Sequence, residues 1–378
     1  MREELIGHIA KDFLGHESFQ LTEWGGGNLN YLYRVDSAKE SYILKYAPPY
    51  IRCLGEDYPL SSERLRYEIL GLKAANETIP EFAPKLFYAA KEGVVMEYLE
   101  GFKLLRQAFI QGEKIPHLAE HLAEMLARFL VKNSFWALNE GERKRLLEQS
   151  ENSLMRRLSE DYIFTFPFME HPTNQKNPTN TPSVREIYQD KEWLGAILWL
   201  KSRFSTAKEG LLHGDLHTGS LMIKGEQIKM IDFEFSFVGP LSFDLGAILA
   251  NWLIAYRTHK ERGEVGGYSQ WLREEMEEFI ERFKERFEFW VSEHGASLVG
   301  VKSYLEALFI EAWGMAGVKI ARRILGAAGV EDITSLEFQV KEEAERRLLA
   351  LSREMTLRAA LGIIPLQKSG QEAYSWLF

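Results

Sequence analysis

The chain has 378 residues, of which 46% are hydrophobic, and a formal net charge of −9. This length predicts two lobes or domains, the apolar content excludes a disordered chain, and the acidic balance disfavours nucleic-acid binding because negative charges repel phosphate backbones. The single cysteine, Cys53, cannot form a disulfide within the chain, which favours a reducing cytoplasm. The N-terminus lacks a signal-peptide pattern, and the most apolar stretch, 241–255, is too short to span a bilayer, so we expect no membrane partner.

The first hundred residues show one helical pattern and then several strand-like ones. Leu5, Ile9 and Phe13 recur at four-residue spacing and predict an amphipathic helix within residues 1–16. We expect a small lobe at residues 17–98, built on a five-stranded antiparallel sheet. Its strands are predicted at residues 19–22, 31–35, 41–46, 84–90 and 93–99.

A glycine-rich turn separates the first two predicted strands. It contains Gly26, Gly27 and Asn28. Backbone N–H groups that no Cβ shields can approach phosphate oxygens closely, so this turn is a candidate phosphate-binding loop. A plain flexible hairpin explains the same residues equally well when the turn is considered alone.

Lys45, near the end of the third predicted strand, has a candidate partner on the helix that follows. Ser61 or Ser62 is expected to cap this helix, which runs to about residue 76. The spacing of its apolar residues places Glu68 on the inward face, whereas Glu63 faces away. Because a buried carboxylate needs a cation, we predict an ion pair between Lys45 and Glu68. A solvated lysine at the sheet edge is the alternative.

Residues 99–378 predict a larger, mostly helical lobe. A proline-rich segment at 164–188 interrupts the helical pattern and is expected to form an ordered excursion or lid. Helical spacing is found at residues 118–129, 143–158, 193–200, 269–293, 303–325 and 335–359.

The stretch from Leu211 to Asp244 contains the most informative pattern. His213-Gly-Asp215 and Asp232-Phe-Glu234 flank a short apolar hairpin, with the two aspartates 17 residues apart (215 to 232). This layout brings both aspartates to one end of a small sheet. Phosphoryl transfer needs one carboxylate near the attacking hydroxyl and others on the metal that neutralises the phosphates. The alternative is two ordinary surface turns, which Asp and Gly also favour.

These motifs resemble those of the kinase-like small-molecule phosphotransferases, the relatives of aminoglycoside and choline kinases. The longer motifs HGDLHTGS, IDFEF and GPLSFDLGA are similar to those of the methylthioribose kinases in particular. Protein kinases carry Asn five residues after the catalytic Asp, where this chain has Ser220, a poor metal ligand. Glu234 stands where they have Gly, and it compensates by providing a second carboxylate beside Asp232. From Trp24 to about Gly326 the resemblance keeps the expected order.

The resemblance implies a two-lobed α+β fold of the protein-kinase type, with ATP and Mg²⁺ between the lobes. The reaction would transfer the γ-phosphoryl group to the anomeric hydroxyl of 5-methylthioribose in methionine salvage. The resemblance assigns catalysis to Asp215, Arg322 and Arg323, and metal binding to Asp232 and Glu234. The sugar would be bound by Asp215, His217 and Arg322. The nucleotide would contact Gly26, Gly27, Asn28, Lys45, Glu68, Glu97 and Tyr98.

Four positions carry more specific expectations. His213 is expected to fix the catalytic loop, and Asp244 to brace it, with helix capping by Ser242 or Asp244 as the alternative. Adjacent helical residues point about 100° apart, so both arginines could approach one phosphate only if the helix end unwound, which Gly326 would permit. We therefore expect unequal roles, with Arg322 turned inward by the helical spacing and Arg323 anchoring the helix to an acidic neighbour.

Two other functions remain open from the sequence. One is a related kinase acting on an aminoglycoside, choline or homoserine. The other is a pseudokinase that binds nucleotide without turnover, for which Ser220 is the best argument, while Asp215, Asp232 and Lys45 argue against it. The sequence leaves the oligomeric state open, a homodimer included.

Overall fold

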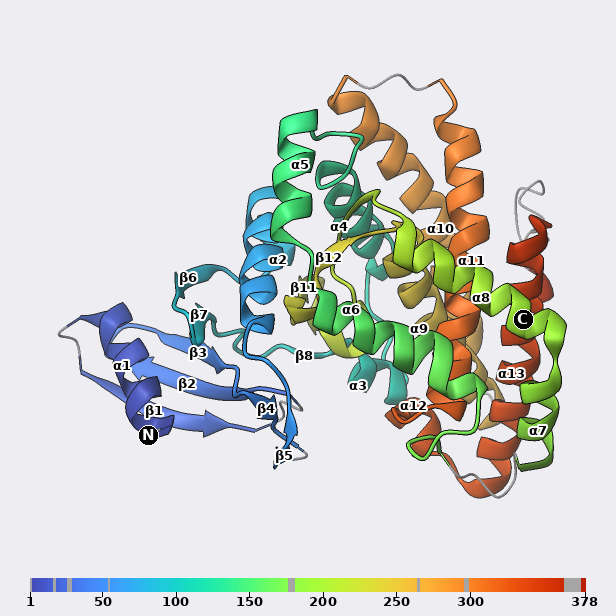
Figure 1. The fold of residues 1–378 in the computed structure, drawn as a ribbon, viewed down its shortest axis with the longest axis horizontal. Helices are drawn as coiled ribbons and strands as arrows, with labels where there is room; N and C mark the ends of the chain where they lie inside the picture. The colour runs from blue at the N-terminus through green and yellow to red at the C-terminus, as the bar shows by residue number, and fades with distance from the viewer. Residues whose placement is uncertain are drawn as a thin grey trace.

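The computed structural model describes residues 2–15, 18–25, 29–53, 55–175, 181–263, 266–295, 299–363 and 375–378. A small sheet-containing lobe lies at the left of Figure 1 and a larger helical lobe at the right. The predicted α+β architecture, a five-stranded antiparallel sheet followed by a mostly helical part, is confirmed.

The small lobe is one antiparallel sheet with helix α1 (Arg2–Leu14) on one face. Its strand order is β1-β2-β3-β7-β6. Successive side chains of a strand point to opposite faces, so Val95 packs with α1 while Val94 and Met96 join the core on the other side. The strands are β1 (Phe19–Trp24), β2 (Tyr31–Ser37), β3 (Ser41–Tyr46), β6 (Leu86–Ala89) and β7 (Gly93–Glu97).

Between β3 and β6 the chain forms a short hairpin and then helix α2. The hairpin of β4 (Tyr50–Ile51) and β5 (Gly55–Pro59) was not predicted. Helix α2 (Arg64–Thr78) follows and stands between the sheet and the helical lobe (Figure 1). The expected serine cap is wrong, because the residue before the helix is Glu63 and its side chain makes no capping bond. Ser61 Oγ instead accepts the Glu63 N–H at 3.2 Å.

The helical lobe is organised around α9 (Ser242–Glu261) and α11 (Val301–Leu325). Every residue of α9 from Ser242 to Thr258 is buried, as expected of a helix that neighbours surround on all sides. No helix in the described ranges is long and apolar enough to cross a membrane. The other helices are α3 (Leu105–Ile110), α4 (Leu118–Lys132), α5 (Glu140–Gln149), α6 (Ser153–Ser159), α7 (Thr181–Gln189), α8 (Lys191–Thr206), α10 (Tyr268–Glu293), α12 (Glu331–Thr334) and α13 (Phe338–Leu361).

Two small antiparallel sheets carry the motifs of the large lobe. β10 (Leu221–Lys224) and β11 (Gln227–Met230) form the predicted hairpin, which β8 (Lys103–Leu104) joins. β9 (Gly210–Leu212) pairs with β12 (Phe237–Gly239). The loop after β9 contains His213 and Asp215, and the loop before β12 contains Asp232 and Glu234, so the two motifs share one end of these sheets.

One helical prediction differs from the structure, and the segment predicted as an excursion contains short helical turns. The pattern at 143–158 is not one helix, because α5 ends at Gln149 and α6 begins at Ser153, with Asn152 at a positive φ of 38° between them. The segment 164–188 contains the end of the π-helical turn η2 (Glu160–Thr165), the 3-10 turn η3 (Phe166–Phe168) and α7, with residues 176–180 outside the described ranges.

Candidate active site

The loop after β9 that contains His213 and Asp215, the predicted catalytic loop, is held by hydrogen bonds from its backbone N–H groups to Asp244. The Asp244 carboxylate accepts the N–H groups of His213 at 2.6 Å and Gly214 at 3.1 Å, as expected of a bracing residue. Gly214 has a φ of 85°, and a Cβ there would lie 2.2 Å from the Phe235 carbonyl oxygen, so only glycine fits. The capping alternative fails, since neither Ser242 nor Asp244 caps α9.

His213 fixes the position of Asp215 within this loop. Its Nε2–H donates to the Ile231 carbonyl at 2.8 Å, and its Nδ1 accepts the Asp215 N–H at 3.2 Å. Ser220, at the position of the protein-kinase Asn, donates its hydroxyl to the Asp215 carbonyl at 2.9 Å. Ser220 therefore has a structural partner in the loop, which explains its burial without any metal.

Asp215 lies between a histidine and an arginine. His217 Nε2 is 3.4 Å from one carboxylate oxygen, and Arg322 Nη2 is 3.8 Å from the other. Burial alone would raise the pKa of Asp215, but the contact with His217 and the charges of Arg322 and Arg323 hold it well below its usual range. Burial lowers the pKa of His217 to about 4, so the imidazole is neutral near pH 7; its Nδ1 accepts the Gly219 N–H, which leaves the ring proton on Nε2, the atom that faces Asp215. The Asp215 carboxylate is therefore charged.

The predicted ion pair of Lys45 with Glu68 is present. Lys45 Nζ lies 2.8 Å from Glu68 Oε2, and both side chains are buried. Glu63, the alternative carboxylate, is exposed. Lys45 also contacts Asp232, so a residue of the small lobe reaches the second motif of the large lobe. The carboxylates of Asp232 and Glu68 attract the ammonium strongly enough to raise the pKa of Lys45 despite its burial.

Asp232 and Glu234 lie in one short loop but point to different partners. Asp232 has a left-handed backbone, with a φ of 72°, and half of its side chain is exposed. Glu234 is buried, accepts a hydrogen bond from Asn30 Nδ2 at 2.9 Å and lies 3.4 Å from Arg64 Nε. Burial and the neighbouring Asp232 raise the pKa of Glu234 to about 7.

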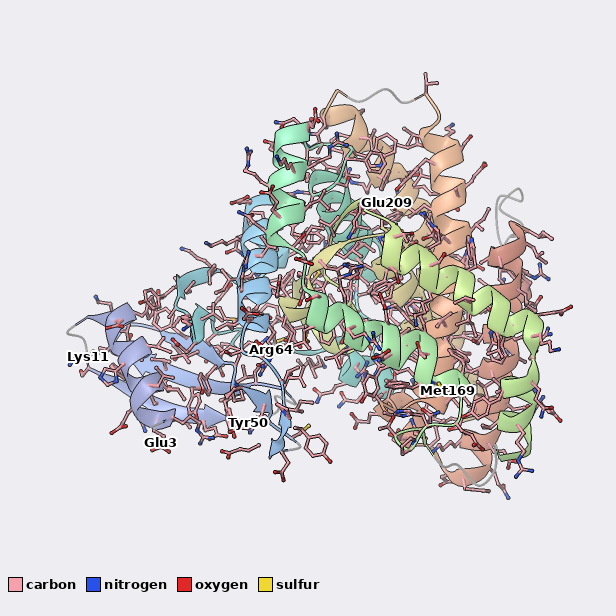
Figure 2. All side chains as sticks on the ribbon, in the orientation of Figure 1. Glu3, Lys11, Tyr50, Arg64, Met169 and Glu209 are labelled. Carbon is pink, nitrogen blue, oxygen red and sulfur yellow. The ribbon has the colours of Figure 1, made fainter. Side chains whose placement is uncertain are left out.

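Two residues that the sequence analysis missed hold this loop in place. Arg64, at the start of α2 where the lobes meet (Figure 2), donates to Asn30 and to four backbone carbonyls, of Leu29, Pro48, Leu60 and Ser61. Asn152, in the break between α5 and α6, donates to the carbonyls of Glu234 at 3.0 Å and Ser236 at 2.9 Å. No sequence spacing links these residues to the loop; the fold alone brings them there.

The two loop carboxylates suit a magnesium ion that is shared with nucleotide phosphates. Among the described residues, no group of three or more His, Cys, Asp or Glu side chains forms a ready-made metal site. Mg²⁺ at phosphate sites normally uses one or two carboxylates, with phosphate oxygens and waters as the other ligands. Burial and then repulsion from Asp232 raise the pKa of Glu234, and a bound cation would offset both effects. Asp232 and Glu234 therefore fit the ion.

Of the other residues predicted to contact the nucleotide, the structure describes Glu97 and Tyr98. Glu97 ends β7 and accepts the Lys85 N–H at 3.0 Å, with Lys229 Nζ at 3.6 Å. Tyr98 lies beneath the Arg34 guanidinium, 4.6 Å from its ring centroid. Gly26, Gly27 and Asn28 lie outside the described residues.

Arg322 and Arg323 both face the pocket of Asp215, from the last turn of α11. The helix stays regular to Leu325, and Gly326 follows at a φ of −83°, so the helix end does not use the loosening that Gly326 would permit. Arg323 Nη1 donates to the Ala328 carbonyl at 3.3 Å, and among the described residues it forms no ion pair with an acidic side chain. Gln175 Nε2 donates to the Arg323 carbonyl at 3.2 Å, which places the 164–188 segment beside the arginine pair.

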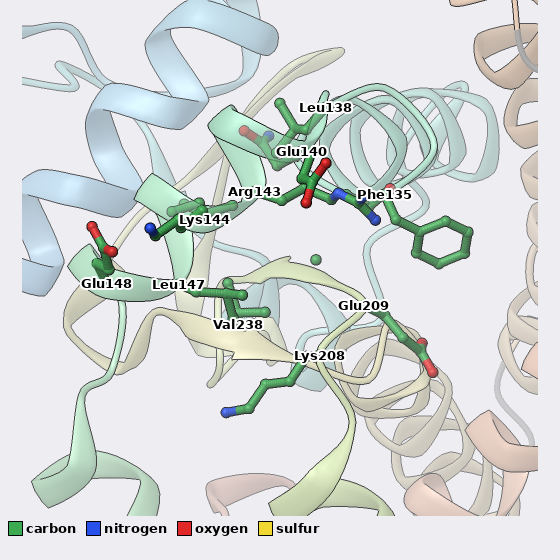
Figure 3. A pocket seen from close by; sticks show the side chains of 14 residues that line it. Phe135, Leu138, Glu140, Arg143, Lys144, Leu147, Glu148, Lys208, Glu209 and Val238 are labelled. Carbon is green, nitrogen blue, oxygen red and sulfur yellow. The ribbon is translucent and has the colours of Figure 1, made fainter.

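The pocket at Asp215 is narrow in this conformation. Its volume is about 10 Å³, so its walls must move for a sugar to enter. The polar residues of the wall are Asp215, His217, Asn251, Lys319, Arg322 and Arg323. A larger cavity of about 410 Å³ lies between α5 and the β9–β12 pair (Figure 3), and none of the predicted site residues lines it.

Taken together, a lysine–glutamate pair on the small lobe and two carboxylate motifs on the large lobe define a kinase-like phosphotransferase. The sequence model of the phosphotransferase enzyme family matches residues 20–279. The chain belongs to this family, and it is an ATP-dependent kinase.

The chain is also similar to named proteins. The chain is 32% identical over 343 residues to the methylthioribose kinase of Bacillus cereus (strain AH820), covering 88% of this chain and 86% of the relative. It is 32% identical over 347 residues to that of Geobacillus kaustophilus (strain HTA426), covering 89% and 86%. Among solved structures, a choline kinase from Cryptosporidium parvum is 17% identical with a TM-score of 0.49, covering 100% of both chains.

Proposed function

We propose that the protein phosphorylates the anomeric hydroxyl of 5-methylthioribose, giving 5-methylthioribose 1-phosphate in methionine salvage. The observation that carries this proposal is the charged Asp215 carboxylate between His217 and Arg322, at the wall of a cation-lined pocket. The names of the relatives support the choice of sugar. A cytoplasmic location belongs to the proposal because cellular ATP is found there.

In this proposal Asp215 acts on the acceptor. Its carboxylate orients the anomeric hydroxyl and takes its proton as the oxygen forms a bond to the γ-phosphorus. The bond from that phosphorus to the β,γ-bridging oxygen breaks, and its electron pair leaves with ADP. A carboxylate with a low pKa is a weak base, so we assign it mainly to orientation and to late proton transfer.

The opposite side of the site serves the nucleotide. Lys45, fixed by Glu68, would contact the phosphates, and Asp232 with Glu234 would hold Mg²⁺. The ion, when bound, neutralises charge on the phosphate oxygens during transfer. Arg64 and Asn152 position Glu234 for this role through the contacts described above.

The acceptor pocket argues against the rival kinases. Lys319, Arg322 and Arg323 all line it, whereas Asp215 is the only carboxylate among the described residues of its lining. Choline and aminoglycosides are cations that such a wall repels, but a neutral sugar that leaves as a phosphate is compatible with it. The intact Lys45–Glu68 pair and the braced Asp215 favour turnover over a pseudokinase.

A substrate panel tests the proposal. Purified protein with ATP and Mg²⁺ is offered methylthioribose, ribose, choline and kanamycin, and ADP release is measured. We expect ADP release with methylthioribose to exceed that with any other acceptor by at least about tenfold, the effect of a few well-placed contacts. Equal or faster ADP release with choline or kanamycin would reject the sugar, and no release with any acceptor would favour the pseudokinase.

A further inference from the structure

Lys319 is a buried amine in the acceptor pocket without an assigned role. It lies on α11, one turn before the arginine pair, and is 7% exposed. Within the described residues it makes no hydrogen bond or ion pair, and its Nζ lies 3.5 Å from the centre of the Phe243 ring. A ring face satisfies an ammonium only in part, so burial of this amine is costly unless a ligand contacts it.

The helix geometry groups Lys319 with the two arginines. At about 100° per residue, Lys319 lies about 60° from Arg322 on one side and about 40° from Arg323 on the other. Its side chain therefore projects between theirs, and all three line the same pocket. Their combined charge suits one ligand better than three separate partners.

The acidic groups nearby do not balance these three cations. Asp332 is 3.2 Å from Arg106 of α3, and the Asp244 carboxylate, which accepts the N–H groups of His213 and Gly214, also attracts the Lys319 amine. Among the described residues Asp215 is the one carboxylate in the pocket lining, so with Asp244 two carboxylates act against the three cations Lys319, Arg322 and Arg323. The pocket thus carries a positive excess, which a neutral sugar cannot offset but a phosphate can.

We infer that Lys319 binds the phosphoryl group after transfer, completing a three-cation site with Arg322 and Arg323 for the product phosphate. This inference rests on the proposed function, because it takes the product to be a sugar phosphate. Arginines bind phosphate oxygens through paired N–H groups, and a lysine between them adds a compact point charge. The chemical class of the ligand is a phosphate monoester.

The titration of Lys319 supports this role. Burial lowers the pKa of its amine to about 7, with Arg322 and Arg323 acting in the same direction and Asp215 and Asp244 opposing them. The neutral His217 is the other titratable group in the pocket wall. Near pH 7 the amine thus exchanges its proton readily, and an arriving phosphate favours the charged form. We expect product binding to take up a proton between pH 7 and 8.

Calorimetry with inorganic phosphate tests the inference directly. Wild type, Lys319→Met and the control Lys302→Met, on the exposed first turn of the same helix, are titrated in saturating ADP and Mg²⁺ so that the nucleotide site is filled. We expect Lys319→Met to bind phosphate at least tenfold more weakly, and Lys302→Met to match wild type within twofold. Lys319→Arg, which keeps the charge, should recover part of the loss. Equal phosphate affinity in all proteins would overturn the inference.

Kinetics supply a second readout that separates binding from folding. In Lys319→Met, inhibition by added methylthioribose 1-phosphate should weaken at least tenfold, with the KM for ATP changed less than twofold. If Lys319→Met does not fold, Lys319→Gln gives the same comparison with a polar side chain. A lower melting temperature with unchanged product inhibition would make Lys319 purely structural and reject the inference. If wild type ignores methylthioribose but binds phosphate through Lys319, the sugar assignment fails while the phosphate site stands.

Discussion

Asp215 keeps its charge because His217, Arg322 and Arg323 outweigh the cost of its burial. We predict that Asp215→Asn lowers kcat by about 10²–10⁴-fold, the usual contribution of a positioned acid–base group. Nucleotide affinity should stay within a factor of about two, because the Lys45 pair lies on the opposite side of the site. Single-turnover kinetics and ADP titrations measure the two effects. A loss of ADP affinity as large as the loss of rate would instead place Asp215 on the metal.

The two arginines should have unequal effects. Arg322 approaches Asp215 at 3.8 Å, whereas Arg323 is held by the Ala328 carbonyl. Arg322→Ala should cost about 2.7–4 kcal/mol of transition-state stabilisation, the scale of one lost oxyanion-type donor. Arg323→Ala should lower the melting temperature more than kcat. Steady-state kinetics and melting curves on both variants decide the matter, and the reverse pattern would exchange the two roles.

The raised pKa of Glu234 leads us to predict that metal binding depends on pH. Its pKa is raised to about 7, by burial and by Asp232, and a metal binds the ionised carboxylate. Below pH 7 the apparent affinity for Mg²⁺ with ADP should therefore fall, by up to about tenfold per pH unit, and above it the affinity should level off. Glu234→Gln should bind the metal weakly and without this dependence. Affinities measured from pH 5.5 to 8.5 would contradict the assignment if the two proteins showed the same slope.

At the scale of elements, the break between α5 and α6 positions the metal loop. Asn152 donates to two buried carbonyls of that loop, so Asn152→Ala leaves both unpaired, at a cost of about 1–3 kcal/mol each. We expect lower stability together with lower kcat. Asn139→Ala, which removes the exposed capping box of α5, is the matched control and should change stability by about 0.5–2 kcal/mol without changing kcat. Denaturant midpoints and kcat on both variants check this, and an unchanged kcat in Asn152→Ala would refute the positioning role.

Local sequence patterns predicted the helices whose apolar residues recur at regular spacing. They did not predict where a helix is interrupted. The apolar stripe of α2 was enough to place Glu68 beside Lys45, because helix periodicity fixes which face is buried. The charged pattern at 143–158 continues across the break, so spacing alone could not reveal the positive φ of Asn152. Gly326 was a reasonable candidate for a loosened helix end, yet its N–H bonds to the Arg322 carbonyl at 3.0 Å and the helix persists.

At the scale of the whole molecule, the site depends on contacts between residues far apart in sequence. Asn30 and Glu234 are 204 residues apart and Lys45 and Asp232 are 187 apart, and both contacts join the small lobe to the large one. The motifs predicted which carboxylates matter, but not that Arg64 and Asn30 would link Glu234 to the end of the glycine-rich turn. Such links follow from how the lobes pack, which no local spacing encodes.

The central claim concerns the acceptor oxygen, and phosphorus NMR of the reaction products tests it most directly. Wild-type protein is incubated with ATP, Mg²⁺ and methylthioribose, with Asp215→Asn as the slow control. We predict one new phosphate monoester resonance, coupled to the anomeric proton of the sugar and formed in equal amount with ADP, which Asp215→Asn forms at least about a hundredfold more slowly. A phosphate on any other hydroxyl, or ADP with free phosphate alone, would contradict the account.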